Sequence, residues 1–159
     1  MNTNEQIIER FYTCFAQLDW QGMTALYSDD IIFSDPVFGL LQGAEAKAMW
    51  EMLCKQAKDF TLTFSQVEAD EEYGTCQWVA DYTFSATGKK VTNRIKAHMR
   101  LADGKIIEHT DEFSLYRWMR MALGLPGTLL GWSGFMQRKV KNGARGKLRQ
   151  FMERKQATA

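Results

Sequence analysis

The sequence has little cysteine, and its first residues lack a long apolar segment. Cys14, Cys54 and Cys76 are its three cysteines, and they lie far apart with no Cys-x-x-Cys pair. This spacing argues against a disulfide framework or a zinc knuckle, so we expect reduced thiols in the core. Because the N-terminal residues carry neither a basic segment nor an apolar stretch, we expect no secretory signal, no membrane-spanning helix and a cytoplasmic location.

Motifs that would identify a reaction are also missing. The sequence contains no phosphate-binding loop, no dinucleotide-binding glycine fingerprint, no Gly-x-Ser-x-Gly and no zinc-ligand spacing. Hydrophobic residues make up 45% of the chain and charged residues 25%, which is the composition of a globular protein. At 159 residues the chain is long enough to bury its own core. We therefore expect one globular domain that uses no cofactor.

Charge is unevenly distributed along the chain. Residues 1–116 contain 10 Lys and Arg against 18 Asp and Glu, a net charge of −8. Residues 117–159 contain 10 against 1, a net charge of +9, which restores the overall +1. This asymmetry marks the last quarter of the chain as a distinct basic element that could dock on an acidic surface.

Helical periodicity dominates the beginning of the chain. Thr3-Asn4-Glu5-Gln6 has the pattern of a capping box, and apolar residues recur at helical spacing over residues 7–18. Asp19 is placed to cap a shorter helix that carries Trp20, Met23, Leu26 and Tyr27. We expect two consecutive amphipathic helices here.

A short β-like run, residues 31–34, ends at Asp35-Pro36. Residues 39–43 then form a loop or a weak strand, and a third helix covers residues 44–54. From Phe60 onward the hydrophobic period changes from helical to two. Four successive runs alternate apolar with polar residues, which is typical of an antiparallel meander, and helices followed by strands indicate an α+β fold. The four runs are residues 60–65, 77–85, 93–101 and 107–115.

The connection at Ala102-Asp103-Gly104 determines how the last two strands pair. A two-residue turn at Asp103-Gly104 would set the apolar face of one strand beside the polar face of the next. We therefore expect an odd-length, bulged turn with Gly104 in the left-handed region. The resulting inner-face pairs would be Ala97 with His109 and Ile95 with Asp111.

Three polar residues interrupt apolar surroundings: Asp35, His109 and Asp111. A buried carboxylate or imidazole needs partners or an internal pocket, and a His two residues from an Asp suits acid–base catalysis, because the carboxylate can orient the ring. A simpler interpretation is open for each. Asp35 before proline is typical of a turn, and His109 and Asp111 could merely hydrogen-bond each other beneath the C-terminal arm. A metal site is not expected, because it usually needs three or more protein ligands.

Helical periodicity returns after Leu115. One helix ends at Gly124-Leu125-Pro126-Gly127, and a second apolar piece holds Leu129, Leu130, Trp132 and Phe135. A basic helix ends the chain. Its apolar side carries Val140, Leu148, Phe151 and Met152.

Several short motifs follow one another in an order that belongs to a known family. They are Leu18-Asp19-Trp20, Leu26-Tyr27-Ser28-Asp29-Asp30, Asp35-Pro36-Val37-Phe38-Gly39, Gly43, Met99-Arg100-Leu101 and Asp103-Gly104-Lys105-Ile106. The sequence thereby resembles the NTF2-like superfamily over residues 5–116, and most nearly its SnoaL-like proteins. That group includes polyketide cyclases, and its relatives include ketosteroid isomerase and limonene-epoxide hydrolase.

The resemblance implies an NTF2-like cone of the α+β class. A curved antiparallel sheet would wrap around the N-terminal helices over residues 1–116, and residues 117–159 would form an additional basic helical arm packed on the same domain. It also implies a homodimer that forms through the outer face of the sheet.

The resemblance further implies site residues. Asp35 matches the Asp-Pro position of the ketosteroid isomerase general base, and His109 and Asp111 match positions that carry acid–base residues in SnoaL-like cyclases. The oxyanion Asp of ketosteroid isomerase falls on Ala97, and its Tyr donor falls near Phe11 or Tyr12. Because one such donor is worth about 3 kcal/mol, steroid isomerisation is disfavoured.

The resemblance also implies that the cone encloses a pocket, which aromatic and Met side chains would line. Apolar residues in this pattern are also typical of a core without a pocket. The residues expected to line the pocket are Phe11, Tyr12, Phe15, Trp50, Phe60, Leu62, Trp78, Tyr82, Phe84, Ile95, Ala97, Met99, Phe113 and Trp118.

Three functional hypotheses follow. The first is a cofactor-free acid–base enzyme of the isomerase, cyclase or epoxide hydrolase type, in which Asp35, His109 and Asp111 act on a small hydrophobic substrate. The second is a non-catalytic module for ligand binding or dimerisation. The third assigns the basic arm to a peripheral membrane or nucleic-acid contact, of which the membrane is the better match and nucleic acid is not an expected partner.

Overall fold

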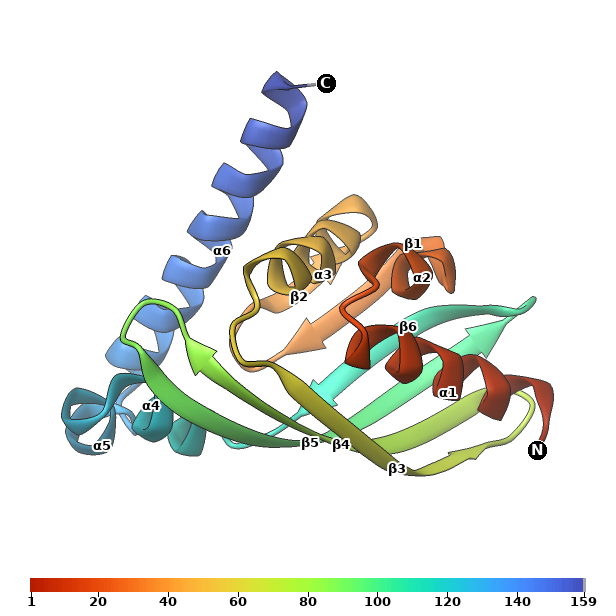
Figure 1. Ribbon diagram of the computed structural model, residues 1–159, viewed down its shortest axis with the longest axis horizontal. Helices are drawn as coiled ribbons and strands as arrows, with labels where there is room; N and C mark the ends of the chain where they lie inside the picture. The colour runs from red at the N-terminus through yellow and green to blue at the C-terminus, as the bar shows by residue number, and fades with distance from the viewer. Residues whose placement is uncertain (159) are drawn as a thin grey trace.

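The computed structural model describes residues 1–158, and it has the predicted α+β class (Figure 1). Three helices lie on one side of a curved, open six-stranded sheet, and three more follow the sheet at the C-terminus. The elements are α1 (Thr3–Ala16), α2 (Trp20–Ala25), β1 (Tyr27–Asp35), β2 (Gly39–Gln42), α3 (Ala44–Gln56), β3 (Thr61–Ala69), β4 (Tyr73–Phe84), β5 (Lys89–Ala102), β6 (Lys105–Glu112), α4 (Leu115–Leu123), α5 (Leu125–Leu130) and α6 (Gly134–Ala157).

The sheet has the strand order β2-β1-β6-β5-β4-β3. The predicted antiparallel meander is confirmed, because β3 to β6 are neighbours in chain order and each pair runs antiparallel. The first strand adds one parallel pairing, β1 with β6, so the complete sheet is mixed. This pairing brings the end of β1 beside the end of β6 and joins segments that lie far apart in the sequence.

The start of α1 differs from the prediction. The helix is capped by Asn2, whose side chain accepts a hydrogen bond from the backbone N–H of Glu5 at 2.8 Å, and the Glu5 side chain accepts one in return from the Asn2 N–H. The capping box predicted for Thr3 and Gln6 is therefore wrong by one residue. Asp19 does cap α2, accepting from the Gly22 N–H at 2.9 Å.

The turn between β5 and β6 was also predicted wrongly. Asp103 and Gly104 form a two-residue turn in which both have positive φ, 53° and 76°, and Leu101 pairs with Ile106. A turn of this kind matches the twist of the flanking strands, which is why an Asp-Gly pair favours it. The odd-length loop that we expected does not form.

The register is instead corrected inside the strand. The pairing skips Ile107, which makes a β-bulge directly after the turn and returns the apolar face of β6 to the apolar face of β5. The inner-face pairs are Met99 with His109 and Ala97 with Asp111. Both expected pairs are therefore displaced by two residues along β5, although the faces match as expected.

The C-terminal arm (α4 to α6) contacts the rest of the molecule at a few defined points. Trp118, Met119 and Ala122 of α4 are buried, and Leu148 is the buried residue of α6. Much of α6 projects away from the sheet (Figure 1). None of the helices in residues 1–158 combines the length and apolar content that a bilayer crossing requires.

Candidate functional site

His109 and Asp111 point from β6 into the space beneath α1. His109 is fully buried and Asp111 is 4% exposed, whereas their neighbours Glu108, Thr110 and Glu112 are exposed. The two-residue spacing therefore places both side chains on the inner face, as the alternation predicts. They contact each other directly: His109 Nε2 lies 2.9 Å from Asp111 Oδ1.

The imidazole ring belongs to a longer hydrogen-bond chain. Trp50 Nε1 donates to the hydroxyl of Tyr27 at 2.8 Å, and that hydroxyl lies 2.7 Å from His109 Nδ1. Trp78 Nε1 donates to Asp111 Oδ1 at 3.4 Å. The chain thus joins α3, β1, β6 and β4 across the inner face.

The donors in this chain define the tautomer of His109. Tyr27 already accepts the Trp50 proton, so its own proton has an acceptor when it points to His109 Nδ1. The ring then carries its proton on Nε2 and donates it to Asp111. Both ring nitrogens of His109 and the buried Tyr27 hydroxyl thus have hydrogen-bond partners, and a buried hydroxyl without one would cost about 1–3 kcal/mol.

Aromatic rings enclose His109. The ring of Trp50 stacks on it at a centroid distance of 6.0 Å, and Phe11 and Phe33 contact it edge to face at 5.5 and 5.2 Å. Burial among these rings, with the Asp111 charge as a smaller cause, raises the pKa of Tyr27 well above its ordinary value. Tyr12 has its pKa raised well above the ordinary value for the same two reasons. Both phenols therefore stay protonated and can donate hydrogen bonds.

Asp35 ends β1 on the same inner face. The parallel pairing matches Phe33 with His109 and Ser34 with Thr110, so Asp35 occupies the next position, beside Asp111. One Asp35 oxygen accepts the backbone N–H groups of Val37 at 2.9 Å and Phe38 at 2.6 Å, which is the turn role that a residue before proline suggests.

The environment of Asp35 nevertheless differs from that of an ordinary turn residue. Burial raises its pKa to about 7, the Phe38 and Val37 amides oppose this shift, and the Asp111 charge adds to it. Asp35 also contributes to the raised pKa of Tyr82, whose main cause is burial. Asp35 and Asp111 are thus neighbouring carboxyl groups with different surroundings, one in a turn and the other held by a His and a Trp.

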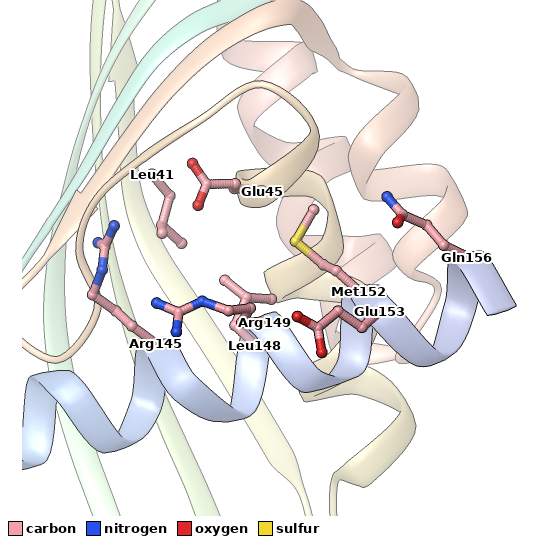
Figure 2. Close-up of a pocket in the computed structure, with 8 residues that line it drawn as sticks. All are labelled: Leu41, Glu45, Arg145, Leu148, Arg149, Met152, Glu153 and Gln156. Carbon is pink, nitrogen blue, oxygen red and sulfur yellow. The ribbon is translucent and has the colours of Figure 1, made fainter.

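The residues predicted to line a pocket lie in the core or against it. Phe11 and Trp50 of this set pack directly on His109, and two hollows of the surface lie elsewhere. The first, about 250 Å³, is formed where α6 crosses β2 and α3 (Figure 2). The second, about 530 Å³, opens on the outer face of the sheet where β6 ends beside β5. Its wall is mostly exposed polar residues and includes Ile95 and Phe113 from the predicted set.

Two residues of this region were missed by sequence reasoning. Tyr27 fits the helical period of residues 20–27, but it is the first residue of β1 and the partner of His109. Asn93 interrupts the apolar inner face of β5 between Val91 and Ile95 and is 7% exposed. The sequence did indicate this position, because Asn93 occupies an inner-face place in the alternating pattern of β5.

Comparisons with known proteins agree with this architecture. The sequence matches the SnoaL-like domain over residues 8–109. A search of curated protein sequences gave no match. An NTF2-like protein of unknown function from Burkholderia pseudomallei K96243 is 17% identical, with a TM-score of 0.65 over 76% of this chain and 98% of that chain.

Two further solved structures are similar. A hypothetical protein with a ketosteroid isomerase-like fold from Catenulispora acidiphila DSM 44928, in complex with trimethylamine, is 15% identical, with a TM-score of 0.66 over 80% of this chain and 96% of that chain. A candidate polyketide cyclase from Silicibacter sp. TM1040 is 20% identical, with a TM-score of 0.66 over 76% of this chain and 94% of that chain. At these identities the structures establish the fold, and the domain match establishes the family: the chain belongs to the SnoaL-like domain family.

Proposed function

We propose that this protein is a cofactor-free acid–base enzyme that moves a proton on a small hydrophobic substrate, with Asp35 as the residue that exchanges the proton. The observation that supports the proposal most is the carboxyl pair of Asp35 and Asp111. Acid–base catalysis is most effective when the pKa of the catalytic group lies near the working pH. Asp35, with a pKa of about 7, meets this condition.

His109 and Asp111 are positioning residues in this proposal. Both are held by protein partners, so they act through Asp35 rather than on the substrate. The Asp111 charge contributes to the raised pKa of Asp35, after burial. Two neighbouring carboxyl groups in unlike environments commonly divide into a proton-exchanging group and a permanently charged one.

The substrate would reach Asp35 from the end of the sheet where β6 stops. The inner face at this end carries Ile95, which lies two residues along β5 from Ala97, the partner of Asp111. The open hollow of about 530 Å³ lies on the opposite, outer face. Trp118 of α4 donates to the Tyr82 hydroxyl at 2.8 Å on the same side of the sheet as Ile95. The proposed binding space is therefore bounded by β5, β6 and α4. The apolar and aromatic side chains on this side, Ile95, Tyr82 and Trp118, suit a small hydrophobic molecule.

The proposal can be tested with a simple carbon acid. 2-Tetralone has acidic α-hydrogens, whose exchange in D₂O is followed by NMR, and the hydrolysis of styrene oxide tests epoxide chemistry. We expect the protein to accelerate at least one of these reactions, and Asp35→Asn to reduce the acceleration by about 10²–10⁴-fold. The rate should rise with pH through about 7 if Asp35 acts as a base. His98→Ala on the outer face serves as the control, and an unchanged rate in Asp35→Asn would refute the proposal.

A second candidate function is ligand binding without catalysis. It is favoured by the closure of the His109 network: within residues 1–158, every fully buried side-chain nitrogen or oxygen has a hydrogen-bond partner. In that case 2-tetralone would bind with the same affinity to the wild type and to Asp35→Asn, and neither protein would accelerate exchange. The homodimer through the outer sheet face stays a prediction.

A further inference from the structure

An apolar tip lies at the junction of α5 and α6, far along the chain from the proposed site. It consists of Leu125, Leu129, Leu130, Trp132 and Phe135. Trp132 is 72% exposed and Phe135 is 70% exposed, which are large values for aromatic side chains. Isolated exposed apolar residues are ordinary, but here five fall within eleven consecutive residues at one helix junction, and clustered exposed apolar side chains mark interaction surfaces.

The way α5 packs explains why its leucines are exposed. The buried residue of this helix is Gly127, and a Cβ atom there would lie 2.0 Å from the carbonyl oxygen of Met119 in α4. The helix therefore rests on α4 through a residue without a side chain. An amphipathic helix normally buries its leucines, whereas α5 leaves them in solvent.

The tip is held in place by hydrogen bonds. Trp132 Nε1 donates to the carbonyl of Leu129 at 2.9 Å, and Ser133 Oγ donates to that of Leu130 at 2.8 Å. Ser133 also caps α6 by accepting the Met136 N–H at 3.2 Å. The apolar side chains are thus displayed by an ordered turn, so little conformational freedom remains to be lost when a partner covers them.

Positive charge surrounds the tip. Residues 113–152 contain 8 Lys and Arg and no Asp or Glu. Arg138 and Lys139 are exposed one turn after Phe135 on the same side of α6, and Arg117 and Arg120 are exposed on α4, against which α5 packs. Apolar side chains flanked by cations complement a binding surface that has an apolar interior beneath a layer of negative charge.

We propose that the apolar tip and its basic surroundings bind the surface of an anionic phospholipid membrane. Trp, Phe and Leu side chains would enter the boundary between headgroups and acyl chains, while Arg138 and Lys139 contact the phosphates. A symmetric contact between two copies would instead bring the same positive charge against itself. Nucleic acid offers no counterpart for the three exposed leucines.

Vesicle sedimentation tests this proposal on the full chain. The wild type should bind phosphatidylcholine vesicles that contain phosphatidylglycerol, bind pure phosphatidylcholine much less, and release at high salt. Trp132→Ala combined with Phe135→Ala should reduce binding by about tenfold or more, because both rings lose their apolar contact. Arg138→Glu combined with Lys139→Glu should also reduce binding by about tenfold or more and remove the preference for anionic lipid.

Matched controls are available elsewhere on the surface. Tyr73→Ala removes an aromatic side chain that is 57% exposed, and Lys58→Glu reverses an exposed charge far from the tip in sequence; both should bind vesicles like the wild type. Circular dichroism checks that every variant folds. Three results would overturn the proposal: equal binding to both vesicle types, unchanged binding by the tip variants, or self-association through the tip, seen by analytical ultracentrifugation, without vesicle binding.

Discussion

The inner face of the sheet and the C-terminal arm differ in where they place apolar side chains. Around His109 the rings of Phe11, Phe33 and Trp50 all point inward and leave the imidazole without solvent contact. In the arm, Trp132 and the leucines of α5 point outward. The inner face buries all of these rings, whereas the arm buries Trp118, Met119, Ala122 and Leu148 and leaves its α5–α6 junction in solvent.

Polar contacts provide part of the attachment of the arm to the body. Glu51 of α3 is 2% exposed and accepts hydrogen bonds from Lys55 at 2.6 Å and from Lys155 of α6 at 2.5 Å. Arg145 of α6 donates to the carbonyls of Phe38 and Leu40 at 2.8 and 2.9 Å. The arm can therefore keep its apolar residues free and still hold a fixed position, which a surface intended for a partner requires.

The largest expected effect comes from removing the imidazole at the centre of the inner face. His109→Ala leaves the Tyr27 hydroxyl and the Asp111 carboxylate without their partner, so we expect the free energy of unfolding to fall by about 3–5 kcal/mol in urea titrations. His98→Ala is the matched control, because His98 forms an exposed pair with Glu112 at 3.1 Å. Its effect should stay below about 1 kcal/mol. Equal losses in the two variants would contradict the conclusion that the buried His109 stabilises the protein more than the exposed His98 does.

A smaller effect is expected where the arm joins the body. The Lys155 and Lys55 hydrogen bonds outweigh the opposing effect of burial and lower the pKa of Glu51. Glu51→Gln should cost about 1–3 kcal/mol and increase amide exchange mainly in α6. Glu71→Gln, an exposed carboxyl between β3 and β4, is the control.

The same lowered pKa makes the attachment depend on pH. The stabilisation by Glu51 is fully present above the ordinary carboxyl pKa of 4.5 and is lost as the pH falls through the lowered value. Exchange in α6 should therefore increase in acid in the wild type but not in Glu51→Gln.

Asp35 should have the opposite dependence on pH. Its pKa rises from 3.8 to about 7 in the folded protein, so the folded state holds a proton more tightly and stability decreases as pH rises through that interval. Asp35→Asn cannot ionise and keeps an oxygen for the Val37 and Phe38 amides. We expect this variant to exceed the wild type by about 4 kcal/mol at pH 8 and to match it at low pH, as measured by urea unfolding at both pH values. If the free energy of unfolding depended on pH in the same way in both proteins, the raised pKa of Asp35 would be contradicted.

The smallest effect is expected at the apolar tip. Trp132→Ala removes a large side chain that makes little contact with the body, so the free energy of unfolding should change by less than about 0.5 kcal/mol. Trp118→Ala, a buried Trp of the same arm, should by comparison cost about 3–5 kcal/mol in the same thermal or urea titrations. A large loss in Trp132→Ala would mean that the tip packs on the body.

The sequence predicted features that arise from local periodicity. Alternation along β6 placed His109 and Asp111 correctly on the inner face, and the hydrophobic periods identified every strand of the meander. Pairing details depend on backbone geometry that periodicity does not contain. The bulge at Ile107 can correct the register after a short turn as well as a longer loop would, and nothing in the composition distinguishes the two.

Contacts distant in sequence were also beyond prediction. Tyr27 follows the apolar period of α2, so its place in β1 and its hydrogen bond to His109, 82 residues later, depend on the parallel pairing of β1 with β6. The raised pKa of Asp35 has the same origin, because burial and the neighbouring Asp111 arise only when these strands meet.

The ionisation of Asp35 determines whether it can exchange a proton at neutral pH. The ¹³C chemical shift of its side-chain carboxyl, assigned by comparison with Asp35→Asn, reports the titration of this one group. We expect a midpoint near pH 7. A midpoint near the ordinary Asp value of about 4 would contradict the proposed role, because Asp35 would then be fully ionised at neutral pH like any turn residue.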